Sequence, residues 1–180
     1  ISFEKGDKYN SWNSEGYKRE FYKIAGSYFP NDNLKINLQY RIRKENEWLI
    51  WTEDNKFGLY DSEQDTFSMG LNWFSGNKHE IRLKSQFVAL QADNPRSLIS
   101  DSGGYLYETD DLIKPFTQGV VSFQVRYKYE IAPLSYLYLV YSKGGTSYDE
   151  DEDYSKSEIF NQPWNNPSDE VYSIKFRLKY

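Results

Sequence analysis

Apolar and polar residues alternate along much of this chain with a period of two. The last ten residues show the pattern most clearly, because every second position carries a large apolar side chain: Tyr172, Ile174, Phe176, Leu178 and Tyr180. The positions between them are polar or basic: Ser173, Lys175, Arg177 and Lys179. Side chains of a strand point alternately to its two faces. The segment is therefore predicted to be a strand that is apolar on one face and basic on the other.

The same alternation recurs at several places upstream. It predicts strands over residues 22–29, 34–43, 67–73, 80–89, 121–131 and 136–142, and residues 1–5 fit the end of one more. With the final segment, seven to eight strands are visible, which indicates an antiparallel all-β fold.

The connections between these strands alternate between short and long. Turn-forming residues occupy 30–33, 75–78 and 132–135, whereas residues 44–65, 92–117 and 143–170 are expected to be long loops. Outer-membrane barrels have short periplasmic turns and long outer loops. The predicted fold is an antiparallel up-and-down transmembrane β-barrel in a bacterial outer membrane, with a periplasmic C-terminus, extracellular long loops, and contacts with outer-membrane lipid and lipopolysaccharide.

Composition narrows the class of protein without fixing its activity. The chain has 180 residues, of which 18% are aromatic, and no cysteine. We treat residues 1–180 as a single barrel region, and the start at Ile1 rather than Met favours the C-terminal portion of a longer protein. A net charge of -5 argues against nucleic-acid binding. No cofactor is predicted.

A soluble protein is the alternative. A Tyr-rich β-sandwich that binds carbohydrate would also show alternating strands. Five aromatic residues outside the cleanest strands could stack on sugar rings, or anchor a barrel rim: Trp48, Trp51, Tyr105, Tyr107 and Trp164. Strand lengths near ten residues, the rhythm of the connections and the terminal aromatic residue favour the barrel.

The polar strand faces carry an excess of basic residues. If the apolar faces point outward, the inward-facing bases are Lys23, Lys35, Arg41, Arg43, Arg82, Lys84, Arg126, Lys128, Lys175, Arg177 and Lys179. Only Glu80 and Glu130 oppose them on these strands. One hypothesis is a basic lumen that attracts anions or an acidic plug. The alternative is that these bases pair with acids from missing strands or infolded loops.

The acidic run at 149–153 is a weak candidate for binding Ca²⁺ or Mg²⁺. Asp149, Asp151 and Asp153 would be the ligands. No glycine follows at the position that a calcium-binding loop requires, so a solvated loop is the other interpretation.

Nucleophilic catalysis lacks the residues it needs. Ser102 precedes two glycines, as in some protease nucleophile loops, but a serine nucleophile needs a base within hydrogen-bond reach. His79 is the only histidine, and it is expected beside a short turn at the opposite end of the strands. The chain is predicted to be non-enzymatic.

Residues 71–84 and 123–144, together with the final strand, resemble the C-terminal part of a family of uncharacterised bacterial outer-membrane proteins. Members carry an N-terminal carbohydrate-binding module similar to family nine, followed by a longer barrel region. The resemblance implies a larger barrel, completed by missing N-terminal strands or by other subunits. The family's barrel region has no known function, and the predicted barrel itself favours a role as a pore or transport element, or as a surface-assembly anchor. The module itself is not part of this chain.

The final strand also resembles the signal that the barrel-assembly machinery recognises. Phe176 and Tyr180 are the residues expected to matter most in that recognition.

Overall fold

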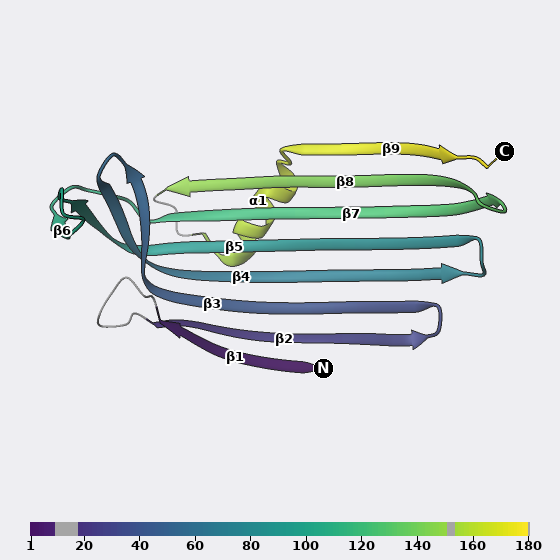
Figure 1. Cartoon of the computed structure of the whole chain (residues 1–180), viewed down its shortest axis with the longest axis horizontal. Helices are drawn as coiled ribbons and strands as arrows, with labels where there is room; N and C mark the ends of the chain where they lie inside the picture. The colour runs from purple at the N-terminus through teal and green to yellow at the C-terminus, as the bar shows by residue number, and fades with distance from the viewer. Residues whose placement is uncertain (10–17, 151–153, 180) are drawn as a thin grey trace.

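The computed structural model describes residues 1–9, 18–150 and 154–179, and this part of the chain forms one antiparallel sheet with one short helix (Figure 1). The elements are β1 (Ser2–Tyr9), β2 (Lys18–Asn31), β3 (Leu34–Glu53), β4 (Lys56–Ser75), β5 (His79–Ser100), β6 (Leu106–Thr109), β7 (Phe116–Ala132), β8 (Ser135–Glu150), α1 (Lys156–Asn165) and β9 (Asp169–Arg177). The all-β, antiparallel prediction is confirmed.

The strands follow one another as an up-and-down meander. Their order in the sheet is β1-β2-β3-β4-β5-β7-β8-β9, and β6 pairs with the far end of β5. Strands β1 and β9 form the two opposite edges, so the sheet is open (Figure 1). Closure into a barrel therefore stays a prediction.

The three connections that were predicted to be short lie at one end of the sheet. They join β2 to β3, β4 to β5 and β7 to β8, all on the right of Figure 1. In the first of them, the side-chain oxygen of Asn31 accepts a hydrogen bond from the backbone N–H of Asn33 at 2.9 Å. This is the Asx-type turn chemistry that the residues at 30–33 predict.

The expected long loops are largely strand, so this prediction is wrong. Strands β3 and β4 each have 20 residues and β5 has 22, and only Asp54 and Asn55 lie between β3 and β4. Of residues 143–170, the first eight belong to β8 and ten form α1.

Bulges explain why the alternation fails to predict these strand extensions. The register between β3 and β4 shifts between Glu45 and Trp48, where Glu47 has φ 57, and β5 has an irregularity near Asn94, where φ is 51. An extra residue in one strand moves every later side chain to the other face. Trp48 consequently pairs with Tyr60 and lies on the face opposite to the one its parity in β3 predicts.

The final strand is shorter than the sequence pattern indicates. Strand β9 ends at Arg177, and the backbone N–H of Lys179 then donates to the Ser135 hydroxyl oxygen at 3.1 Å. Leu178 therefore follows the strand, and Tyr180 lies outside the described residues.

Helix α1 was not predicted. It begins with a capping box in which Ser155 accepts from the backbone N–H of Glu158, and the Glu158 side chain accepts from the backbone N–H of Ser155. That pairing was the available sequence signal, but ten residues that include Pro163 give little helical periodicity. No helix among the described residues has the length and apolar character needed to cross a membrane.

The helix packs closely on β5, β7 and β8. Ile159 is fully buried, and Gly119 and Gly145 allow the approach of the helix backbone. A Cβ atom at Gly119 would lie 2.3 Å from the carbonyl oxygen of Ile159, and one at Gly145 would lie 2.1 Å from that of Pro163. Any side chain at either position would therefore push the helix away from the sheet.

We accordingly expect Gly145→Ala to destabilise the fold by about 1–3 kcal/mol, the usual cost of overpacking a close contact. Urea denaturation measures the loss. Gly70→Ala is the matched control, because a Cβ there finds its nearest neighbour at 3.6 Å. Equal stability of the two variants would contradict the helix packing described above.

Candidate functional site: the polar face of the sheet

The strand register sorts the side chains onto two chemically different faces. Tyr40, Phe67, Phe87 and Val121 are consecutive partners across β3, β4, β5 and β7, and they define the apolar face. The neighbouring row on the other side contains Gln39, Ser68, Gln86 and Ser122, which define the polar face. The alternation in the sequence is thus carried in register across four strands.

The middle of the polar face is hollow. The hollow has a volume of about 830 Å³ and extends from β1 to β7. Its side chains are mostly neutral hydrogen-bonding groups: Ser27, Asn37, Gln39, Ser68, Gln86, Ser122 and Gln124. Lys84 is the one charged side chain among the described residues that line it. Such a lining can hold a hydrated or hydroxylated solute.

The polar face becomes basic toward the short turns. Glu80 is only 8% exposed and pairs with Arg82, with Arg126 at 3.6 Å and with Lys128 at 3.6 Å. Lys175 and Arg177 lie on the same face, opposite Tyr138 and Tyr136. One buried carboxylate thus faces several cations, so this end of the polar face has an excess of positive charge.

Acidic partners account for some of the predicted inward bases. Lys23 pairs with Glu4 at 3.2 Å, and Glu80 holds the three bases named above. Lys35 lies over the Phe29 ring at 5.3 Å, and Arg41 over the Phe21 ring at 6.0 Å. Among the described residues, no ion pair holds the remaining predicted bases: Arg43, Lys84, Lys175, Arg177 and Lys179.

At the end away from the short turns, the polar face carries a cluster of aromatic side chains. Phe116 lies 5.2 Å from Tyr60, 5.3 Å from Tyr148 and 6.3 Å from Trp48, measured between ring centroids. Ala92 is fully buried in the same row as Phe116. The alternation in the sequence does not predict this aromatic cluster, because the bulge at Glu47 brings Trp48 to this face.

The other candidate sugar-stacking residues are divided between helix α1 and the strand ends away from the short turns. Trp164 belongs to α1 and packs on the apolar face, with its ring centroid 5.5 Å from that of Phe123. Trp51, Tyr105 and Tyr107 are 62%, 70% and 54% exposed. Trp48 packs on the polar face and Trp164 on the apolar face, so the five predicted residues do not form one platform.

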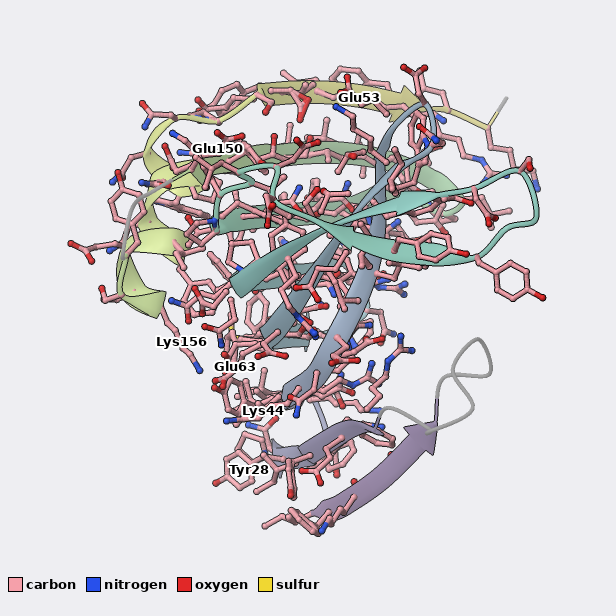
Figure 2. The ribbon with its side chains drawn as sticks, turned by 90° about the vertical axis from the view of Figure 1, so that its left-hand side faces the viewer. Tyr28, Lys44, Glu53, Glu63, Glu150 and Lys156 are labelled. Atoms are coloured by element: carbon pink, nitrogen blue, oxygen red, sulfur yellow. The ribbon has the colours of Figure 1, made fainter. Side chains whose placement is uncertain are left out.

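A group of ion pairs lies where the apolar face ends, on the side away from the predicted short turns (Figure 2). Lys44 pairs with Glu63 at 2.8 Å, while Lys156 of α1 pairs with Glu63 and, at 2.6 Å, with the buried Asp65. We call these four residues the border cluster. In Figure 2, Lys44, Glu63 and Lys156 lie together beside the helix.

The ion pairs of the border cluster shift the pKa values of Glu63 and Lys156. Partial burial would raise the pKa of Glu63, but hydrogen bonds from Lys156 and Lys44 outweigh it and lower this pKa below its usual value. Burial would lower the pKa of Lys156, but hydrogen bonds to Asp65 and Glu63 raise it. Both groups are therefore charged at neutral pH.

The described part of the acidic run, Asp149 and Glu150, belongs to strand β8. Asp149 lies in β8 opposite Thr117, and Glu150 lies opposite Phe116. Asp151 and Asp153 lie outside the described residues. Within the described ranges, no three His, Cys, Asp or Glu side chains are grouped so that they could hold a metal ion.

His79 and Ser102 lie in different places, as the sequence indicates. His79 is on β5 beside a short turn, where its ring contacts the Tyr127 hydroxyl at 2.7 Å and stacks on Tyr129. Ser102 follows the far end of β5. There Asp101 accepts backbone hydrogen bonds from Gly103 at 2.8 Å and Tyr105 at 2.9 Å, which makes this segment a turn.

The apolar residues of the final strand are exposed. Tyr172, Ile174 and Phe176 lie on the apolar face and are 76%, 68% and 63% exposed, and Leu178 beyond the strand is 54% exposed. Strand β9 pairs only with β8, so its other edge is open among the described residues.

Comparison of the chain with protein-family models, with curated proteins and with solved structures finds no match. The family resemblance therefore stays a prediction.

The border cluster gives a pH-dependent stability. The folded-state pKa of Glu63 is below its unfolded value, so its contribution is complete above about pH 4.5 and is lost as the pH falls through the lower, folded value. We measure the free energy of unfolding by urea denaturation. On acidification, we expect this free energy to fall less for Glu63→Gln than for the unsubstituted chain. The expected difference is about 1 kcal/mol, because the site is partly solvated. Parallel stability curves for the two proteins between pH 7 and pH 3 would contradict this role.

Proposed function

We propose that the chain is a non-enzymatic part of a bacterial outer-membrane β-barrel, in which the apolar face contacts lipid and the polar face lines a lumen. In this arrangement it acts as a pore or transport element, or as an anchor for a surface assembly. The observation that carries the proposal is a broad, exposed apolar face opposite a polar face that is basic toward the short turns.

The exposure of the apolar face supports a non-aqueous environment. Ile24 is 50% exposed, Leu38 46%, Leu139 38% and Ile174 68%, and these residues lie on four different strands. Monomeric soluble proteins rarely expose a continuous apolar surface of this breadth, since each Å² in water costs about 25 cal/mol.

The dimensions of the apolar face support a membrane. The apolar positions of β3 run over residues 34–42, those of β5 over 81–89 and those of β7 over 121–129, with Ser85 as the one polar member. A tilted strand needs about 9–11 residues to cross a bilayer core. Trp73, Tyr127 and Tyr129 lie near the short turns, where an interfacial aromatic belt is expected.

The border cluster and helix α1 fit the outer limit of this membrane zone. Lys44 and Glu63 pair in the row directly beyond the apolar stretch of β3, at a place where lipid headgroups and water would solvate them. Asp65 lies one row closer to the short turns, opposite Ile42, where it is buried and paired with Lys156. Helix α1 begins at this border and continues onto the apolar face, where Trp164 packs against Phe87 and Phe123. It exposes Ser157, Glu158, Asn161 and Asn165. The long ends of the strands would extend from this border into the extracellular space, toward lipopolysaccharide, with the C-terminus at the periplasmic side.

The two open edges require strand partners in a membrane, because unpaired backbone groups cannot be left in lipid. Strands β1 and β9 could pair with each other, with missing N-terminal strands or with other subunits. The exposed apolar residues of β9 are the ones that we assign to recognition by the barrel-assembly machinery.

The carbohydrate-binding β-sandwich receives less support. A sandwich has two sheets packed face to face, whereas the described residues form one sheet whose apolar face is covered in part by a single helix.

A pair of neighbouring substitutions tests the membrane assignment. Leu38 and Gln39 are adjacent in β3 and lie on the apolar and polar faces, respectively. We expect Leu38→Lys to impair insertion by about 2–4 kcal/mol, the cost of a charge facing lipid, and Gln39→Lys to insert normally. The readout is the detergent-extracted outer-membrane fraction and its heat-modifiable migration on gels. A native protein found in the soluble fraction, or equal insertion of both variants, would contradict the proposal.

The basic end of the polar face generates a second prediction. Glu80→Gln removes the carboxylate that Arg82, Arg126 and Lys128 share. We expect the anion-to-cation permeability ratio of the reconstituted protein to rise roughly two-fold, because the lumen gains positive potential. Glu53→Gln, at the tip of the β3–β4 hairpin, is the control. A ratio that Glu80→Gln leaves unchanged would argue against an ion pathway along this face.

A further inference from the structure

The hollow of the polar face differs from the basic surface beside it. Arg82 and Arg126 lie one row closer to the short turns and are held by Glu80. Lys84 lies in the next row, opposite Gly70 and Gln124, and none of the described residues that line the hollow is acidic. Within the described part of the chain, the hollow thus combines one unpaired cation with a neutral polar wall.

Lys84 has no partner among the described residues. Its side chain is exposed, and neither a hydrogen bond nor an ion pair engages its ammonium group. An ammonium group has three donors and no acceptor. A carboxylate or phosphate entering the hollow would therefore find a charge that is not already neutralised.

The neutral side chains around Lys84 provide both donors and acceptors. Asn37, Gln39, Gln86 and Gln124 each present an amide, and Ser68 and Ser122 each present a hydroxyl. These groups match the hydroxyls of a polyol, which also donate and accept. No aromatic side chain lines the hollow among the described residues, so recognition there would use hydrogen bonds rather than ring stacking.

The floor of the hollow leaves space for such a ligand. Gly70 lies between Asn37 and Lys84 in the sheet, and a Cβ there would still be 3.6 Å from the Asn37 side chain. A volume of about 830 Å³ lies in the range of about 300–1,000 Å³ that small-molecule sites usually occupy.

From this arrangement we infer that the hollow is a binding site for a small hydroxylated anion, a sugar acid or sugar phosphate in chemical class. Lys84 binds the carboxylate or phosphate, and the surrounding amides and hydroxyls bind the hydroxyl groups. The inference rests on the proposed function, because it names the solute class that the lumen would take.

Calorimetric titration of the full chain, folded in detergent, tests this site. The probes are gluconate, glucose 6-phosphate, sorbitol and acetate. We expect gluconate and glucose 6-phosphate to bind at least ten-fold more tightly than sorbitol, which lacks the charge, or acetate, which lacks the hydroxyls. A preference of one anion over the other distinguishes a carboxylate site from a phosphate site.

Three variants complete the test. Lys84→Gln should reduce gluconate and glucose 6-phosphate binding to the level of sorbitol, and Gly70→Phe should abolish binding by filling the hollow. Lys78→Gln, in an exposed turn outside the hollow, should bind as the unsubstituted chain does. Equal binding by Lys84→Gln, equal binding of acetate, or no binding at all would overturn the inference.

Heat-modifiable migration is recorded for every sample, so the two proposals can fail separately. A folded, membrane-inserted protein that does not discriminate among the probes overturns the binding site alone. A protein that fails to insert into the outer membrane overturns the proposed function.

Discussion

In-register antiparallel pairing of β3, β4, β5 and β7 places apolar side chains beside apolar ones and polar side chains beside polar ones across the sheet. Because side chains alternate with period two, a slip of one residue would exchange the two faces completely. The exposed apolar surface, the hollow around Lys84 and the cation cluster at Glu80 all depend on this register. A single pattern of backbone hydrogen bonds therefore determines both the surface proposed to meet lipid and the surface proposed to meet solute.

Two clusters of charged side chains lie at opposite ends of the apolar stretch of the strands. The border cluster ends the apolar face, while Glu80 with its bases occupies the opposite end of the polar face. Beside the Glu80 cluster, the polar face continues as a mostly neutral wall that includes Lys84. Helix α1 contributes to the border cluster, because its Lys156 pairs with Asp65. Gly119 and Gly145 allow the helix backbone to contact the sheet.

The alternation in the sequence was sufficient to predict the antiparallel strands, their two faces and the short turns. It failed beyond Glu45, where a bulge turns Trp48 to the other face and the strands continue through segments that look like loops. Helix α1 was missed because its stability comes from contacts of Ile159 and Pro163 with the sheet rather than from its own periodicity. The alternation identified the basic residues of the polar face. It could not show which of them pair with Glu80, or that Lys84 pairs with none of the described acids, because these pairings join strands that are distant in the sequence.

The central claim is that the two faces of the sheet meet different solvents, and a cysteine scan of residues 34–42 in the outer membrane of intact cells tests it most directly. The chain has no cysteine of its own, so each single substitution reports one position. The account predicts labelling by a water-soluble maleimide at Lys35, Asn37, Gln39 and Arg41, with the intervening positions protected and quenched by a lipid-dissolved probe. Uniform labelling along the strand, without a period of two, would contradict it.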